Sequence, residues 1–160
     1  MRRIRKYVNI FKSTILWTRA LQSASYKKYD ESLFLLESIY STLSIAIPSE
    51  KSPYEINILT SFVANKLGDY ELSIRSAAMV LAQMKGTSNG LTENDKIYLR
   101  YYCKILIDNS EYFAGVTLPN LNRAKIDTEY QNLNLARVRS HIKSKFPVKV
   151  ANSYTARSDF

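Results

Sequence analysis

Apolar residues recur every three or four positions along most of the chain. The first such run is Ile4, Tyr7, Val8, Phe11 and Ile15, with Arg, Lys and Asn residues on most of the positions between. That period is the period of one face of an α-helix, so the run predicts an amphipathic helix. The pattern extends this helix through Ala24. A second helix is expected from Asp30, because the apolar period resumes there, until Pro48 stops it.

Start and stop signals divide the middle of the chain into two further helices. Ser52 followed by Pro53 and Glu55 predicts a helix start, with the serine as cap, the proline in the first turn and the carboxylate bonded back to the cap. This helix should end at Gly68, which can adopt the left-handed backbone conformation of a helix C-terminus. Asp69 or Tyr70 opens the next helix.

The last third of the chain predicts two more helices. Thr92 and Asp95 form a capping pair before the apolar segment 97–107, which is apolar nearly all round and is therefore expected to be central. Residues 126–146 predict a weakly amphipathic basic helix, and residues 147–160 have no period and are expected to be a flexible tail. We therefore expect one helical domain over residues 1–146.

Composition agrees with an all-α fold of about six helices. The 160 residues are 46% hydrophobic and 23% charged, which is ordinary for a globular protein, and four Gly and four Pro provide few of the turns that a β-sandwich needs. No stretch reaches the roughly 18 apolar residues of a membrane-spanning helix. Lys12 interrupts the apolar part of the basic N-terminus, so we interpret that segment as retained.

One cysteine, Cys103, cannot form an internal disulfide and stands in an apolar run, where a small buried side chain is the simple interpretation. A reducing compartment is compatible with this, and we expect the protein in the cytoplasm.

The formal net charge of +9 is concentrated at the two ends of the chain. Residues 1–30 contain eight basic residues (Lys or Arg) and one acidic residue. Residues 31–120 contain seven basic and ten acidic residues, and residues 121–160 contain eight basic and three acidic residues. The segments thus carry +7, −3 and +5. Basic patches rather than a uniformly basic surface are expected, with an acidic protein, a phosphate backbone or an anionic membrane as the matching surface.

Two stretches of the chain look like copies of one helical hairpin. Residues 26–39 and 67–80 align with an offset of 41, which pairs Tyr29 with Tyr70 and Ser32 with Ser73. In the second copy the sequence Leu-Gly-Asp-Tyr-Glu resembles the turn of a tetratricopeptide repeat, a unit of two antiparallel helices. The first copy has Lys27 where Gly68 stands in the second.

The resemblance implies two hairpins over residues 13–85, stacked in a right-handed array, with additional helices over residues 92–146. It implies close helix crossings at Ala20 with Ser32 and at Ser61 with Ser73. It also implies a concave, mainly apolar face that holds a peptide or a partner's helix. The positions of that face are Thr14, Trp17, Leu21, Ala24, Glu55, Ile58, Phe62, Asn65 and Lys66. The alternative is that the protein's own later helices fill this groove, because large open apolar patches are unusual on monomers.

The residues needed for common enzymatic chemistry are missing from the sequence. One histidine, His141, and one cysteine do not make a zinc site, and the motifs GxGxxG, GxxxxGK[ST] and GxSxG do not occur. Paired acids such as Glu93 with Asp95 stand at predicted helix starts, where capping explains them. We expect no enzymatic activity, no cofactor and no metal.

Non-enzymatic binding of another protein is the function that the sequence favours. The expected site is the groove of Trp17, Leu21, Ile58, Phe62, Asn65 and Lys66, flanked by a basic patch of Arg2, Arg3, Arg5, Lys6, Arg137, Arg139 and Lys143 that steers an acidic partner. Immunity proteins and secretion chaperones are dedicated binders of this kind. Two alternatives remain open: nucleic-acid binding through the basic ends, and contact of residues 1–12 with an anionic membrane.

Overall fold

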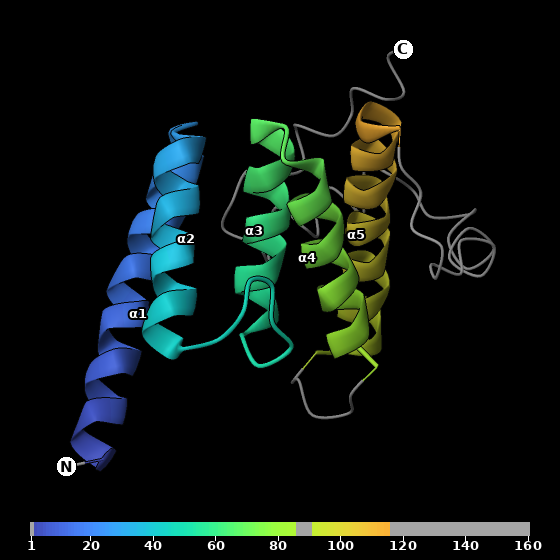
Figure 1. Ribbon diagram of the computed structural model, residues 1–160. Coiled ribbons are helices and arrows are strands. Elements are labelled where there is room, and N and C mark those ends of the chain that lie inside the picture. The colour runs from blue at the N-terminus through green and yellow to red at the C-terminus, as the bar shows by residue number, and fades with distance from the viewer. Residues whose placement is uncertain (1, 86–90, 116–160) are drawn as a thin grey trace.

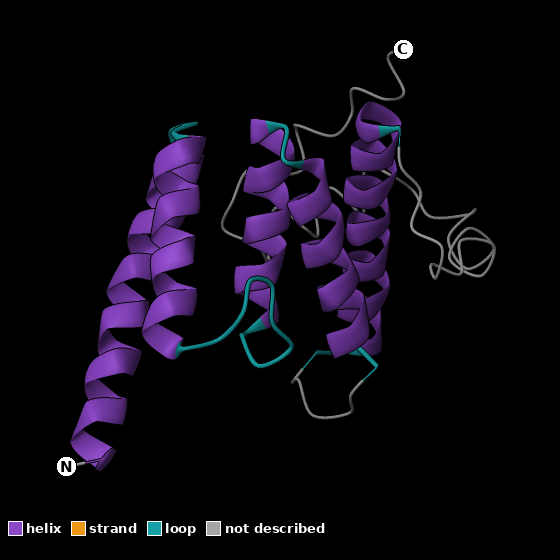
Figure 2. Ribbon diagram, viewed as in Figure 1, coloured by secondary structure: helices purple, strands orange, loops and turns teal. Residues whose placement is uncertain are grey.

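The computed structural model describes residues 2–85 and 91–115, and their side chains from position 7 onward. The helices are α1 (Arg2–Ser25), α2 (Tyr29–Leu43), α3 (Tyr54–Leu67), α4 (Tyr70–Gln83) and α5 (Glu93–Ala114). No strand occurs in these two ranges (Figure 2). The prediction of an all-α fold is confirmed. The predicted sixth helix, 126–146, and the tail 147–160 lie outside the described residues.

Successive helices run antiparallel and stand side by side in chain order (Figure 1). The closest packing is between α1 and α2, between α3 and α4, and between α4 and α5, whereas α2 and α3 touch less extensively. The array therefore consists of two hairpins, α1–α2 and α3–α4, followed by a fifth helix.

The two hairpins turn at matching positions with the same backbone conformation. Gly68 ends α3 with φ 82°, and the Asp69 carboxylate accepts a hydrogen bond from the Leu72 amide at 3.1 Å, which caps α4. Lys27, at the aligned position of the first hairpin, has φ 62°. Because Lys27 has a Cβ atom, this left-handed conformation is sterically strained there, whereas glycine adopts it without strain. The alignment of the two turns thus has a structural counterpart.

Small residues lie at both predicted helix crossings. The Ser32 hydroxyl donates to the backbone oxygen of Ala20 at 2.9 Å, and the Ser61 hydroxyl donates to the backbone oxygen of Ser73 at 2.8 Å. All four residues are fully buried. A larger side chain would separate the backbones, so the helices of each hairpin can approach this closely only because these positions are small.

The start of α3 differs from the prediction by one residue. Pro53, rather than Ser52, precedes the first helical residue, and no side chain caps this end. The one proton of the Ser52 hydroxyl is instead shared between the backbone oxygen of Ser49 and the side-chain oxygen of Asn57. The predicted capping arrangement is therefore wrong, because a buried amide competes for the serine.

α2 also ends before Pro48, the residue expected to stop it. The helix ends at Leu43, and Ser44 takes the left-handed conformation with φ 55°. Pro48 follows within the connection to α3, after a cis peptide bond. The helix thus ends at a left-handed residue and not at the proline.

The capping pair at the start of α5 is confirmed. The Thr92 hydroxyl accepts from the Asp95 amide at 3.1 Å, and the Asp95 carboxylate accepts from the Thr92 amide at 3.2 Å. The buried residues of α5 include Leu99, Cys103 and Leu106. Its neighbours among the described helices are α4 and α3, so it ends the described array instead of standing at its centre.

Gly68→Ala is expected to destabilise the protein by about 1 to 2 kcal/mol, because alanine is strained in the left-handed region. An added Cβ would meet only the Tyr70 hydroxyl, at 4.0 Å, so the effect isolates backbone strain. The matched variant Lys27→Gly removes such strain and should leave stability equal or higher. Urea denaturation measures both. Equal stability of Gly68→Ala and the wild type would contradict the role given to this turn.

Candidate functional site

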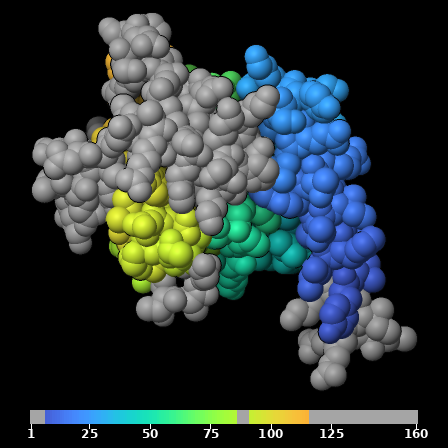
Figure 3. Space-filling model, turned by 180° about the vertical axis from the view of Figure 1, so that it is seen from behind, coloured from blue at the N-terminus to red at the C-terminus, as the bar shows by residue number. Residues whose placement is uncertain are grey.

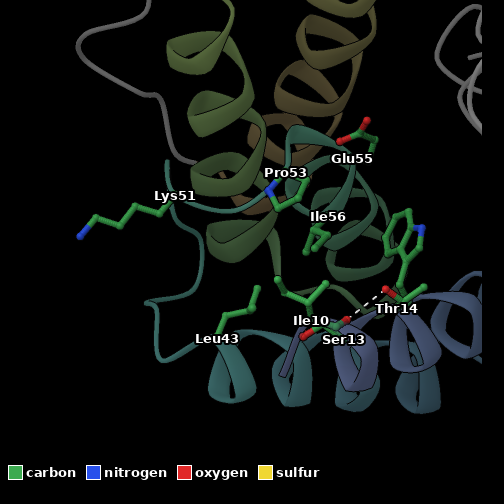
Figure 4. Close-up of a pocket in the computed structure, with 9 residues that line it drawn as sticks. Ile10, Ser13, Thr14, Leu43, Lys51, Pro53, Glu55 and Ile56 are labelled. Carbon is green, nitrogen blue, oxygen red and sulfur yellow. Dashed lines mark hydrogen bonds between the residues drawn. The ribbon is translucent and has the colours of Figure 1, made fainter. Parts of the chain in front are cut away.

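A cleft of about 490 Å³ lies where α1 passes the end of α2 and the beginning of α3. Its lining residues are Ile10, Ser13, Thr14, Trp17, Leu43, Lys51, Pro53, Glu55 and Ile56. The side chains of Ile10 and Leu43 point toward Ile56 (Figure 4). The walls are thus mainly apolar, with one cationic and one anionic residue among them.

The N-terminal end of α1 extends past α2 next to this cleft. α1 has 24 residues and α2 has 15, so the N-terminal end of α1 extends beyond the end of α2 (Figure 1). At about 1.5 Å per residue, the difference is roughly 14 Å of helix without a hairpin partner. The 44–53 connection then brings the first turn of α3 toward the uncovered side of α1.

The Asn57 side chain fixes the connection that forms one wall of the cleft. Its amide nitrogen donates to the backbone oxygen of Ser49 at 2.8 Å and to the side-chain oxygen of Gln83 at 3.0 Å. Its oxygen accepts from the hydroxyls of Tyr40 at 2.8 Å and Ser52 at 3.0 Å. Asn57 is fully buried. One side chain therefore joins α2, the connection, α3 and α4.

Gln83 of α4 holds the same connection from the other side. Its amide nitrogen donates to the backbone oxygens of Glu50 at 3.0 Å and Ser52 at 2.6 Å. Because these backbone oxygens are hydrogen-bonded to Gln83, the connection is held in one conformation. The cleft wall is therefore built by the α3–α4 hairpin as much as by α1.

Burial raises the pKa of Tyr40 to about 12, although its hydrogen bonds with Thr60 and Ser52 work in the opposite direction. The pKa of Tyr54, beside the cleft, is also raised to about 12, first by burial and then by the Glu55 carboxylate. Both hydroxyls therefore stay protonated above the pH at which an exposed tyrosine ionises, and the Tyr40 hydroxyl keeps its donor proton for Asn57.

Trp17 and Leu21, the groove residues predicted on the first helix, are both half-buried and pack against the core. Trp17 also lines the cleft, as do Thr14 and Glu55 of the same predicted face. The structure thus brings these three residues together from two hairpins.

Ile58 and Phe62, the apolar groove residues predicted on the third helix, lie in the core with 6% and 2% exposure. The Phe62 ring meets the Tyr29 ring edge to face, with centroids 5.9 Å apart. The predicted groove is consequently not an open apolar surface at these two positions.

Asn65 and Lys66 make contacts within the protein. The Asn65 amide nitrogen donates to the Ser110 hydroxyl at 2.8 Å, and its oxygen accepts from the Asn109 amide at 3.1 Å, so Asn65 links α3 to α5. The Lys66 ammonium lies 5.8 Å from the centroid of the Phe62 ring. Burial, and then repulsion by Lys27, lowers the pKa of Lys66.

The predicted basic patch is only partly within the described chain. Arg2, Arg3, Arg5 and Lys6 belong to the first turns of α1, whereas Arg137, Arg139 and Lys143 lie outside the described residues. Whether the two ends meet stays a prediction.

A row of exposed apolar side chains runs along the N-terminal half of α1. Tyr7, Val8, Phe11 and Ile15 are 72%, 44%, 68% and 47% exposed, and we call them the outer stripe. They belong to the apolar face that the sequence pattern identified, but no described helix packs on it. The space-filling view places α1 along one edge of the molecule (Figure 3).

Within residues 2–85 and 91–115, no three His, Cys, Asp or Glu side chains are grouped so that they could hold a metal ion. Cys103 is fully buried, and burial raises the pKa of its thiol far above neutral pH. A thiol in this environment is a poor nucleophile. No helix in the same ranges is long and apolar enough to cross a membrane.

A scan against protein-family models, a search of curated proteins and a search of solved structures each give no match. The function must therefore be inferred from the site itself.

Asn57→Ala is expected to destabilise the protein by about 3 kcal/mol, because it leaves several buried donors and acceptors without partners at 1 to 3 kcal/mol each. Asn94→Ala, on the exposed side of α5, is the matched control and should change stability by less than about 0.5 kcal/mol. Urea denaturation measures both. Similar values for the two variants would contradict the structural role of Asn57.

The stability of the protein should fall between pH 10 and pH 12, because the unfolded chain releases the Tyr40 proton near pH 10 and the folded chain only near pH 12. The raised pKa of Tyr40 contributes to the stability of the folded state below pH 10. Roughly 2 to 3 kcal/mol of the free energy of unfolding is lost by pH 12. Tyr40→Phe should lose correspondingly less over this range, whereas Tyr26→Phe, at an exposed position, should follow the wild type. Urea denaturation at a series of pH values measures the free energy of unfolding. The same pH dependence for the wild type and both variants would contradict the raised pKa of Tyr40.

Proposed function

We propose that the protein is a non-enzymatic binding module for another protein, and that its binding site is the cleft between α1 and the start of α3. The observation that supports this most directly is the set of apolar cleft residues contributed by separate elements: Ile10 and Trp17 from α1, Leu43 from α2 and Ile56 from α3. Open sites that combine an aromatic residue with aliphatic walls are typical of recognition of a partner's apolar side chains.

The partner that this cleft suits is a helix with apolar anchors three or four residues apart. Such a helix inserts its anchors between aliphatic walls and keeps its polar side in water. The cleft borders the N-terminal half of α1, where residues 1–30 carry eight basic residues and one acidic residue. Acidic residues flanking the partner's anchors would accelerate association and favour one orientation.

A dedicated binder, such as an immunity protein for a toxin or a chaperone for a secreted substrate, is the biological role that we propose. The tetratricopeptide-like turn at Gly68 and the matching turn at Lys27 support a helical-hairpin binder. A toxin or secreted substrate encoded beside this chain would be the first partner to test.

Trp17→Ala is expected to weaken binding of such a partner by about 2 kcal/mol, roughly 30-fold, because the indole is the largest apolar side chain in the cleft wall. Ile10→Ala should weaken it in the same direction. Phe34→Ala is the matched control, because Phe34 is 66% exposed on α2 and does not line the cleft. Isothermal titration with the purified partner measures the affinities, and thermal unfolding checks each variant's fold. Equal affinities for all folded variants would rule out the cleft as the site.

A further inference from the structure

α1 presents different surfaces in its two halves. In the C-terminal half, Ala20, Ser23 and Ala24 are buried and α1 packs on α2. In the N-terminal half, the exposed large side chains of the outer stripe remain at the surface: Tyr7, Val8, Phe11 and Ile15. Exposed apolar side chains gathered on one face of an end helix mark a surface that can take part in an interaction.

Helix geometry places the outer stripe opposite the packed face. At about 100° per residue, positions 7, 8, 11 and 15 fall within an arc of roughly 100°, and the buried Ala20 lies roughly 170° from its centre. The stripe thus points away from α2. Since α1 is the end helix of the array, no other described helix lies on that side (Figure 1).

The charge around the outer stripe identifies the chemistry of its occupant. From Arg2 to Arg19 the chain has six basic residues and no acidic residue. Lys12 and Arg19 are exposed, and their helical positions lie along one edge of the stripe, the edge that Val8 and Ile15 form. The occupant must therefore combine an apolar interior with an anionic surface. A second copy of this chain fits poorly, because it would bring a second set of basic residues to the contact.

We propose that the N-terminal half of α1 lies on an anionic lipid surface, with the outer stripe inserted among the acyl chains. An amphipathic helix with apolar and aromatic residues on one side and Lys and Arg on the other binds in the interface plane of such a membrane. Tyr7 and Phe11 enter the boundary of the headgroups, and Lys12 and Arg19 keep their charges at the phosphates while their stems cover apolar surface.

The shape of the stripe favours a lipid surface over a partner's helix. A partner helix needs a concave groove that buries its anchors, and the cleft provides one. The outer stripe is instead a convex ridge on the end helix, which a flat, deformable surface can contact along its length. The membrane site is thus a different face of α1 from the proposed protein-binding cleft, and the two can be tested separately.

Co-sedimentation of the full chain with vesicles tests this inference. Wild-type protein should bind vesicles of phosphatidylcholine with phosphatidylserine roughly tenfold or more tightly than vesicles of phosphatidylcholine alone, and binding should weaken as salt rises. Lys12→Gln combined with Arg19→Gln should reduce binding to the anionic vesicles by roughly tenfold.

Phe11→Asp should reduce binding to anionic vesicles by roughly tenfold or more, because it places a charge in the inserted face. Phe34→Asp is the matched control, at a similarly exposed phenylalanine on α2, and should bind as the wild type does. Val8→Asp provides a second stripe variant, and circular dichroism verifies that each variant is folded. Wild-type binding by folded Phe11→Asp and Val8→Asp would overturn the proposal. So would equal binding to neutral vesicles, no binding to either vesicle, or a stripe-dependent dimer in sedimentation velocity.

Discussion

The buried amide of Asn57 is the interaction on which the arrangement of the two hairpins depends. Within each hairpin, helices pack closely at small residues, but α2 and α3 touch less extensively. At that weaker boundary one side chain bonds to Tyr40 of α2, to the 44–53 connection and to Gln83 of α4. In a dry interior each of these polar groups needs its partner, so the network selects one position of the hairpins relative to each other.

The placement of the cleft follows from that constraint. α1 forms one wall of the cleft, and the connection and the first turn of α3 are held opposite it. Pro53 and Ile56 lie in the cleft because Asn57, next in the chain, is fixed in the core. The cleft wall and the core are thus coupled through adjacent residues of α3, whereas no residue of the outer stripe lines the cleft.

Local sequence signals were sufficient to predict those helix ends and turns whose conformation depends on one or two nearby residues. Gly68, Asp69 and the Thr92–Asp95 pair were placed correctly, because left-handed turns and helix caps are settled within a few residues. The prediction that Ser52 caps α3 is wrong, because its hydroxyl bonds to the Asn57 side chain, a contact that forms only in the folded chain. The polar Asn57 within the apolar run Ile56–Leu59 was the available sign of a buried network, but its partners were not readable from spacing.

The sequence by itself determined the five described helices, the turn at Gly68 and the small residues that let the helices of each hairpin cross, because these depend on neighbours along the chain. Only the tertiary structure decided which apolar faces are covered. Periodicity identifies a face as apolar but does not say what packs on it, so Phe62 and Phe11 look alike in the sequence. One is 2% exposed and the other 68% exposed, because α2 and α3 meet around the first and no described helix reaches the second.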